Sequence, residues 1–227
     1  MRQIVLDTET TGLSTKNGDR IIEIGCVEII NRQITGKTFH VYCNPECSIG
    51  KESIAITGID DQFLLEQPKF AEIVEDFLQF IDKSELIIHN ASFDLEFINN
   101  ELKLLNHRIK DLSEELKITD TLMLARKMHP GQRNNLDALC KRYNLNNIDR
   151  TFHGALLDAN ILAKLILKMT AGQISLDFNL AETLSGVNLN SIKSYQNKKL
   201  KIIYANIAEQ QLHEIYLSEV LKHHEAH

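Results

Sequence analysis

The chain has 227 residues, which is enough for one domain of about 150–200 residues and a tail. Hydrophobic residues make up 43% and charged residues 25%, and no apolar run approaches the ~20 residues that cross a bilayer, which argues against a membrane protein. The net charge of −6 argues against tight binding of duplex DNA by this chain alone, because phosphate neutralisation supplies most non-specific affinity.

The start of the chain and its four cysteines bear on the cellular compartment. Asp7 follows Met1 too closely for a signal peptide, which predicts a cytoplasmic protein. The cysteines of such a chain are expected to be free thiols. Cys43 and Cys47 could form half of a zinc site, but no second Cys or His pair stands at ligand spacing.

The first three quarters of the chain combine predicted strands with predicted helices. Strands are expected at 3–7, 21–30, 33–42 and 85–89, with a hairpin turn at Asn31 and Arg32. Helices are expected at 70–82, at 94–105, at about 121–128, at 135–143 and at about 155–170, the last with an apolar stripe of Leu157, Ile161, Leu165 and Met169. Strands that come first and then alternate with helices predict an α/β fold with a mixed central sheet flanked by helices.

The composition changes after residue 172, which sets the predicted domain boundaries. Residues 1–172 are expected to form one domain, 173–200 a polar linker and 201–227 a C-terminal tail. Within the tail, 201–206 is predicted as a strand and 207–222 as a helix with several large apolar residues. Because the tail is too short to bury a core of its own, we expect its apolar surface to pack on a partner.

Two carboxylates, Asp7 and Glu9, lie at the end of the first predicted strand. Residues i and i+2 of a strand point to the same face, so both acids project together. Such a pair is costly unless a cation neutralises it, and hard oxygen ligands favour Mg²⁺ or Mn²⁺. An isolated D-x-E pattern is nevertheless more often a pair of solvated surface acids.

Two further segments carry candidate residues. Asp94 follows the strand at 85–89 and starts a predicted helix, where it is either a metal ligand or a helix cap. His153 lies just before the predicted helix at 155–170, and Asp158 lies on that helix. A lone histidine near a helix start is more often structural than catalytic. Taken together, however, the acids all lie at strand ends or helix starts, where sites on α/β sheets form.

The order D-x-E, then H-N-A-x-F-D, then H-x₄-D resembles the DEDDh 3′→5′ exonucleases. The resemblance covers roughly residues 1–178 and includes I-I-E-I-G at 21–25, T-G-I at 57–59, R-N-N-L-D-A-L-C at 133–140 and H-G-A-L-L-D-A at 153–159. With so many shared motifs, the sequence resembles the epsilon-type proofreading exonucleases of bacterial DNA polymerase III. Thr57 is a departure, since relatives often carry His at this position.

The resemblance implies a ribonuclease H-like exonuclease fold and hydrolysis with two divalent ions, Mg²⁺ or Mn²⁺, about 3.5–4 Å apart. Asp7 would bridge both ions, Glu9 and Asp158 would complete the site beside the attacking water, and Asp94 would serve the second ion. His153 would accept the proton of that water, and the product would be a 5′-mononucleotide. The terminal nucleotide would contact Asp7, Glu9 and Asp158, and also Thr10, Thr11, Gly12, Leu13, Ile56, Thr57 and Phe93.

Phe93 illustrates an alternative that the sequence leaves open. It could stack on a base, or it could pack in the core beside Asp94.

The segment after the predicted domain suggests partners. Gln173, Leu176 and Phe178 resemble the short Q-x-x-L-x-F peptide by which replication proteins bind the sliding clamp. By the same resemblance, the tail at 201–227 would bind the polymerase III alpha subunit, and the substrate would be DNA 3′ ends. Two alternatives remain: a stand-alone DEDDh exonuclease that acts on RNA or single-stranded DNA ends, and a non-catalytic adaptor between polymerase and clamp.

Overall fold

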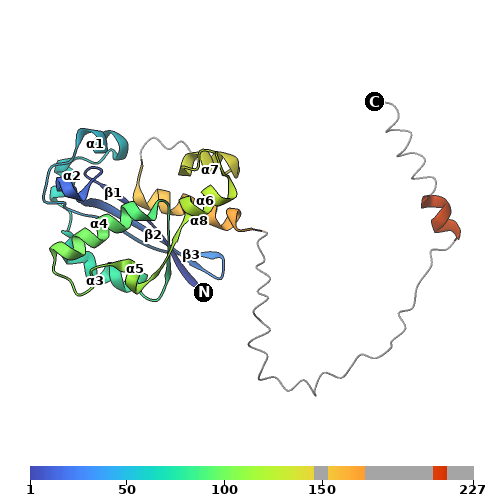
Figure 1. Cartoon of the computed structure of the whole chain (residues 1–227), viewed down its shortest axis with the longest axis horizontal. Helices are drawn as coiled ribbons and strands as arrows, with labels where there is room; N and C mark the ends of the chain where they lie inside the picture. Colours follow the sequence, from blue (N-terminus) through green and yellow to red (C-terminus); the bar gives the residue numbers. More distant parts are fainter. Residues whose placement is uncertain (146–152, 172–206, 214–227) are drawn as a thin grey trace, which may run out of the picture. The chain divides into compact units, whose positions relative to one another are not determined.

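A computed structural model describes residues 1–145, 153–171 and 207–213 (Figure 1). The segment 207–213 is helical and exposed, as predicted for the start of the tail helix. The predicted clamp-binding peptide at 173–178, the rest of the linker to 200 and the strand at 201–206 lie outside the described residues. In the described part of the chain, no helix has the length and apolar character needed to span a membrane.

A five-stranded sheet forms the centre of the domain. Its strands are β1 (Arg2–Thr10), β2 (Ile21–Ile30), β3 (Gln33–Tyr42), β4 (Glu85–Ile88) and β5 (Lys117–Asp120), in the order β3-β2-β1-β4-β5. The pairs β1–β2 and β2–β3 are antiparallel, whereas β4 pairs in parallel with both β1 and β5. The mixed sheet predicted from the sequence is therefore confirmed, and the carboxyl ends of β1, β4 and β5 meet at one edge.

The hairpin between β2 and β3 forms as the sequence predicts. Asn31 and Arg32 have φ values of 49° and 66°, the left-handed conformation that a two-residue type I′ turn requires at both positions. The turn fixes the register of β3 on β2, and Ile30 pairs directly with Gln33.

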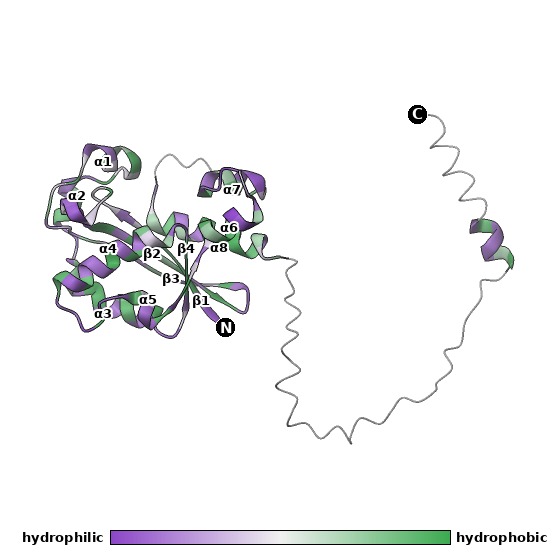
Figure 2. Cartoon of the chain, viewed as in Figure 1, coloured by the Kyte–Doolittle hydropathy of each residue, from purple (hydrophilic) through white to green (hydrophobic). Residues whose placement is uncertain are grey.

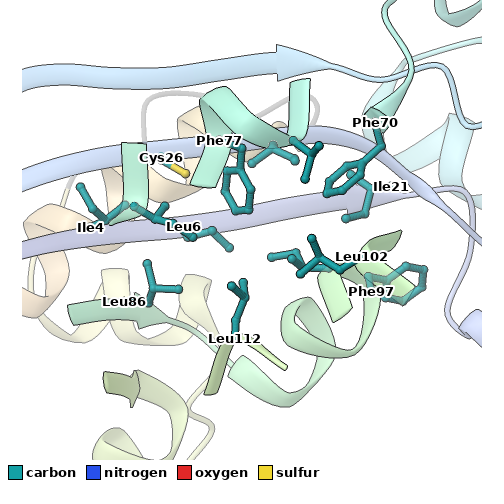
Figure 3. Close-up of a cluster of buried hydrophobic side chains, with 14 of the residues drawn as sticks. Ile4, Leu6, Ile21, Cys26, Phe70, Phe77, Leu86, Phe97, Leu102 and Leu112 are labelled. Carbon is teal, nitrogen blue, oxygen red and sulfur yellow. The ribbon is translucent and has the colours of Figure 1, made fainter. Parts of the chain in front are cut away.

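Helices cover both faces of the sheet (Figure 1). They are the 3₁₀ turn η1 (Thr15–Asn17) and the helices α1 (Lys51–Thr57), α2 (Asp61–Leu65), α3 (Phe70–Ile81), α4 (Ala91–Leu104), α5 (Leu112–Glu115), α6 (Thr121–Met128), α7 (Leu136–Arg142) and α8 (Ala155–Met169). Ile4 and Leu6 of β1 pack with α3 and α4 in one core cluster (Figure 3), whereas Val5 packs with α8 in another. The alternation of side chains along β1 thus divides the core into two layers.

The start of α4 corrects one prediction. The helix begins at Ala91, three residues before Asp94, and its N-cap residue is Asn90 with φ 67°. Asparagine tolerates this left-handed conformation better than most residues, so the chain turns from β4 into α4 almost without a loop. Asp94 is consequently a buried residue of the first helical turn, and its interpretation as the helix cap was wrong.

The buried face of α8 corrects a second prediction. Leu157, which the predicted stripe placed inward, is 46% exposed, and small residues such as Ala155, Ala159 and Ala163 are buried instead. The cause is close packing of α8 on β2: a Cβ atom on Gly25 would lie 2.2 Å from the backbone nitrogen of Leu156. A helix this close to a sheet must present small side chains to it, and a search for large apolar residues cannot detect that.

Candidate active site

The carboxyl end of β1 brings Glu9 next to the start of α8. Glu9 lies on the same face of β1 as Val5, which packs against α8. Each of Glu9, His153 and Asp158 offers one ligand atom, and these atoms all lie within 4.8 Å of one another. A cluster of two carboxylates and an imidazole, with one carboxylate buried, suits a hard divalent cation.

His153 is positioned by α8 and by α1. Its backbone N–H donates to the carbonyl oxygen of Ile56 at 2.9 Å, and its Nδ1 lies 3.5 Å from Oδ2 of Asp158. The Asp158 side chain is buried, but the His153 side chain is 45% exposed. The backbone of His153 is therefore held in place and its imidazole has a carboxylate neighbour, while the ring remains open to solvent and substrate.

Asp94 approaches β1 from the other side of the sheet. Its Oδ1 accepts hydrogen bonds from the backbone N–H of Thr8 at 3.0 Å and from the Thr8 hydroxyl at 2.8 Å. Burial raises the pKa of Asp94 to about 7, and the hydrogen bonds from Thr8 oppose that shift. A buried carboxylate that two donors hold in place is well suited to bind a cation, since a cation would favour its charged form.

The structure brings some of the predicted ligands closer together than others. Glu9, His153 and Asp158 form the tight group, whereas Asp7, two residues earlier on β1, and Asp94 are not part of it. Asp7 is opposite Gly25 in the β1–β2 register, and Gly25 lies against the first turn of α8. The metal-binding roles of all four acids stay predictions.

A cavity of about 770 Å³ opens beside this group. Glu9 and His153 are in its wall, so the cluster of Glu9, His153 and Asp158 borders the cavity directly. The structure also places around it every additional residue predicted to contact a terminal nucleotide, namely Thr10, Thr11, Gly12, Leu13, Ile56, Thr57 and Phe93. Whether these residues bind a nucleotide stays a prediction.

Asp19 and Ser53 also line the cavity, and sequence reasoning missed both. The Asp19 carboxylate accepts from the backbone N–H of Ser14 at 3.0 Å, and a Cβ atom on Gly12 would lie 2.5 Å from its oxygens. The Ser53 hydroxyl donates to the carbonyl oxygen of Thr10, which joins α1 to β1. A side chain at position 12 would therefore have to displace the Asp19 carboxylate, a relation that becomes visible only when the loop after β1 is folded.

Thr57, the departure from the family pattern, has a structural role at the end of α1. Its hydroxyl donates to the carbonyl oxygen of Ser53 at 2.9 Å and accepts from the backbone N–H of Ile59 at 3.2 Å. Gly58 follows in the left-handed conformation that commonly ends a helix. The side chain that stands in place of a histidine thus stabilises a turn in the cavity wall.

Phe93 fits both of the interpretations that the sequence left open. It lines the cavity, and its ring also lies 4.9 Å from that of Phe97 in the core, at an interplanar angle of 45°. Contact with the core holds the ring in place without removing it from the cavity wall.

Comparison with known proteins decides the family. The family model described as Exonuclease matches residues 4–166. The DNA polymerase III subunit epsilon of Salmonella typhimurium is 48% identical over 97% of this chain and 94% of its own. The chain belongs to the epsilon family of exonucleases.

Other epsilon subunits agree with this placement. That of Buchnera aphidicola from Schizaphis graminum is 50% identical over 95% of both chains, and that of Escherichia coli is 46% identical over 97% of this chain and 94% of its own. The chain is accordingly a 3′→5′ exonuclease of the proofreading type, and exonucleases of this family use divalent metal ions.

Solved structures of exonucleases share the fold. Exonuclease X in complex with 5′ overhanging duplex DNA superposes with a TM-score of 0.58 and 26% identity, over 75% of this chain and 92% of that one. E. coli exonuclease I in complex with an oligonucleotide gives a TM-score of 0.63 at 18% identity, over 76% of this chain and 41% of that one. The expected ribonuclease H-like exonuclease fold is confirmed.

Proposed function

We propose that this exonuclease removes 5′-mononucleotides from DNA 3′ ends with two Mg²⁺ or Mn²⁺ ions, held by Asp7, Glu9, Asp94 and Asp158. The observation that carries the proposal is the group of Glu9, His153 and Asp158, which lies at the wall of a cavity large enough for a nucleotide. When bound, the ions would polarise the scissile phosphate and neutralise the charge that develops on it.

His153 is the proposed general base. An imidazole suits this role because its ordinary pKa of about 6.5 lies near working pH. Asp158, whose Oδ2 lies 3.5 Å from Nδ1 of His153, would stabilise the positive charge that the ring gains with the proton. This distance exceeds a normal hydrogen bond, and catalytic contacts often shorten only when substrate binds.

The cavity beside the acids is the proposed site of the terminal nucleotide. Leu13 and Ile56 are 80% and 49% exposed, and both offer apolar surface to a base or sugar at the cavity wall. Entry into this cavity requires an unpaired end, and a mismatched end separates at lower cost than a paired one. Preference for mismatches therefore needs no direct recognition of the wrong base.

A labelled oligonucleotide tests the activity, the substrate and the metal together. A single-stranded DNA with a 3′-terminal label should lose mononucleotides stepwise in Mg²⁺ or Mn²⁺, and EDTA should stop the reaction until either ion is restored. An RNA of the same sequence should be cut more slowly. Faster cleavage of the RNA would favour the stand-alone RNA exonuclease, and activity that survives EDTA would exclude the two-metal mechanism.

We further propose that the chain works as part of a replicative DNA polymerase III, in the cytoplasm beside the chromosome. The relatives bear the name of a subunit of that polymerase. The helical segment 207–213 exposes hydrophobic as well as hydrophilic residues (Figure 2), with Ile207 75% and Leu212 67% exposed. Exposed apolar side chains on a short helix support the proposal that 201–227 binds the polymerase alpha subunit.

Gln173, Leu176 and Phe178 are proposed to bind the sliding clamp. The support is the sequence pattern and its position directly after the exonuclease domain proposed for residues 1–172, within the linker proposed for 173–200. A peptide at this place could engage the clamp while the domain reaches a 3′ end.

A further inference from the structure

A second cavity, of about 590 Å³, opens at the same edge of the sheet as the proposed active site. Six of the seven residues in its wall carry polar side chains. It is lined by His89, Asn90, Leu122, Arg126, Gln132, Asn134 and Asn135.

The sheet topology places the two cavities next to each other at one edge of the sheet. His89 directly follows β4, and β4 is parallel to β1, so His89 lies at the edge where β1 presents Glu9. Phe93 lines the first cavity and Asn90 lines the second, and these residues are about one turn of α4, or ~5.4 Å, apart. Asp94 lies in the same first turn of α4. The first turn of α4 therefore lies between the two cavities.

Arg126 gives the second cavity its positive charge. Within the described residues it makes no hydrogen bond and no ion pair, although it lies in the cavity wall in the last turn of α6. Its guanidinium is near enough to His89 to help lower the pKa of that imidazole, whose burial is the larger cause. An exposed guanidinium without a partner can bind a phosphate with two hydrogen bonds.

The carboxylate of Asp120, which also acts on the pKa of His89, is already engaged by backbone groups. Asp120 accepts hydrogen bonds from the backbone N–H groups of Asn90, Ala91 and Leu122, and so joins the starts of α4 and α6. Asn134 is also occupied, since its amide donates to the carbonyl oxygens of His129 and Gln132. These bonds hold the cavity wall in shape before any ligand arrives.

We propose that this second cavity binds the DNA strand on the 5′ side of the scissile linkage, with Arg126 on a backbone phosphate and the amides of Gln132 and Asn135 beside it. The proposal rests on the proposed function, because the direction of the strand follows from a terminal nucleotide in the first cavity. It makes Arg126 a determinant of affinity for strands longer than one nucleotide.

Two substrates separate this subsite from the catalytic centre. The p-nitrophenyl ester of thymidine 5′-monophosphate offers one nucleotide and a scissile phosphodiester but no upstream strand, whereas a single-stranded oligonucleotide offers both. In Arg126→Ala, the ratio of kcat/KM for the oligonucleotide to kcat/KM for the ester should fall about tenfold, through KM. The salt dependence of oligonucleotide binding should weaken by a slope of about 1.

Lys127→Ala is the matched control, because Lys127 is an exposed cation on the same turn of α6 but does not line the cavity. It should keep the wild-type ratio, and Arg126→Lys should restore part of the loss by returning the charge. An unchanged ratio in Arg126→Ala, or an equal fall in Lys127→Ala, would overturn the proposal. If the wild-type protein hydrolyses neither substrate, the result contradicts the proposed function itself and not only the proposed subsite.

Discussion

Asp7 allows the most direct test of the metal site at the level of one residue. Asp7→Ala should abolish nuclease activity, because a ligand common to both proposed ions would be lost. The fold should persist, since Asp7 is only partly buried and its removal relieves repulsion from the acids nearby. Release of a 3′-terminal label measures the activity, and circular dichroism measures the fold. Asp82→Ala, at an exposed acid after α3, is the control and should be fully active. An active Asp7→Ala enzyme would disprove the metal assignment.

His153→Ala tests the general base separately from the metal ligands. The chemical step should slow by about 10²–10⁴-fold, the usual contribution of a positioned base. Single-turnover kinetics with excess enzyme are needed, because product release could otherwise conceal the effect. A base added as free imidazole could recover part of the rate. An unchanged single-turnover rate would remove His153 from the mechanism.

The residues of the candidate site differ in how visible they are in the sequence. Asp7, Glu9, Asp94, His153 and Asp158 could be predicted because their order and spacing form a recognisable pattern. Asp19 could not, since its contacts depend on how the loop after β1 folds, and Ser53 could not, since it contacts Thr10, which is distant in the chain. The burial of Asp94 was also hidden, because it arises where α4 lies beside β1 and Thr8 of β1 donates two hydrogen bonds to the carboxylate.

Among the secondary-structure elements, the long strands and helices were the most predictable. β2 and β3 match their predicted bounds, since a run of β-branched residues on each side of a turn leaves little choice of register. The short elements α1, α2, α5 and β5 were missed as elements, because four to seven residues show too little periodicity. They form because tertiary contacts stabilise them.

The packing of α8 on β2 leads to a prediction about Gly25. Gly25→Ala should destabilise the fold by about 1–3 kcal/mol and reduce nuclease activity more than stability alone would require, because α8 carries His153 and Asp158. Thermal unfolding and a nuclease assay at a temperature where the variant is folded would measure both effects. Gly154→Ala is the matched control, since its new methyl group would be 3.8 Å from the Glu23 carboxylate, an ordinary contact. Equal effects of the two substitutions would contradict this explanation.

The ion pair between β1 and β2 leads to a prediction about pH. The Arg2 guanidinium donates to buried Glu28 at 2.7 Å and holds the pKa of that carboxyl below its usual range. A lowered folded-state pKa means that the stabilisation is complete above the unfolded pKa of about 4.3 and is lost as pH falls through the folded value. Glu28→Gln should therefore cost about 1 kcal/mol in urea unfolding at pH 7, and much less at pH 3. A pH-independent difference would show that the pair contributes through shape alone.

At the scale of the whole molecule, the exonuclease domain and the tail should separate in function. A chain that ends at residue 180 should keep its activity on free single-stranded DNA but should no longer co-purify with the polymerase alpha subunit.

Replacement of Gln173, Leu176 and Phe178 by Ala in the full chain should weaken binding to the sliding clamp and leave polymerase binding intact. Co-purification of the truncated chain, or unchanged clamp binding, would refute the corresponding assignment.

The close contact at Gly25 has a consequence for the inheritance of errors. The spacing between a helix and a sheet sets the distance from Glu9 to His153 and Asp158, so the catalytic group depends on a contact that allows no additional methyl group. Substitutions that loosen α8 would disturb this group before they unfold the domain. Cells that carry such variants should accumulate mutations more rapidly as the growth temperature rises, although their polymerase still copies DNA at its normal rate.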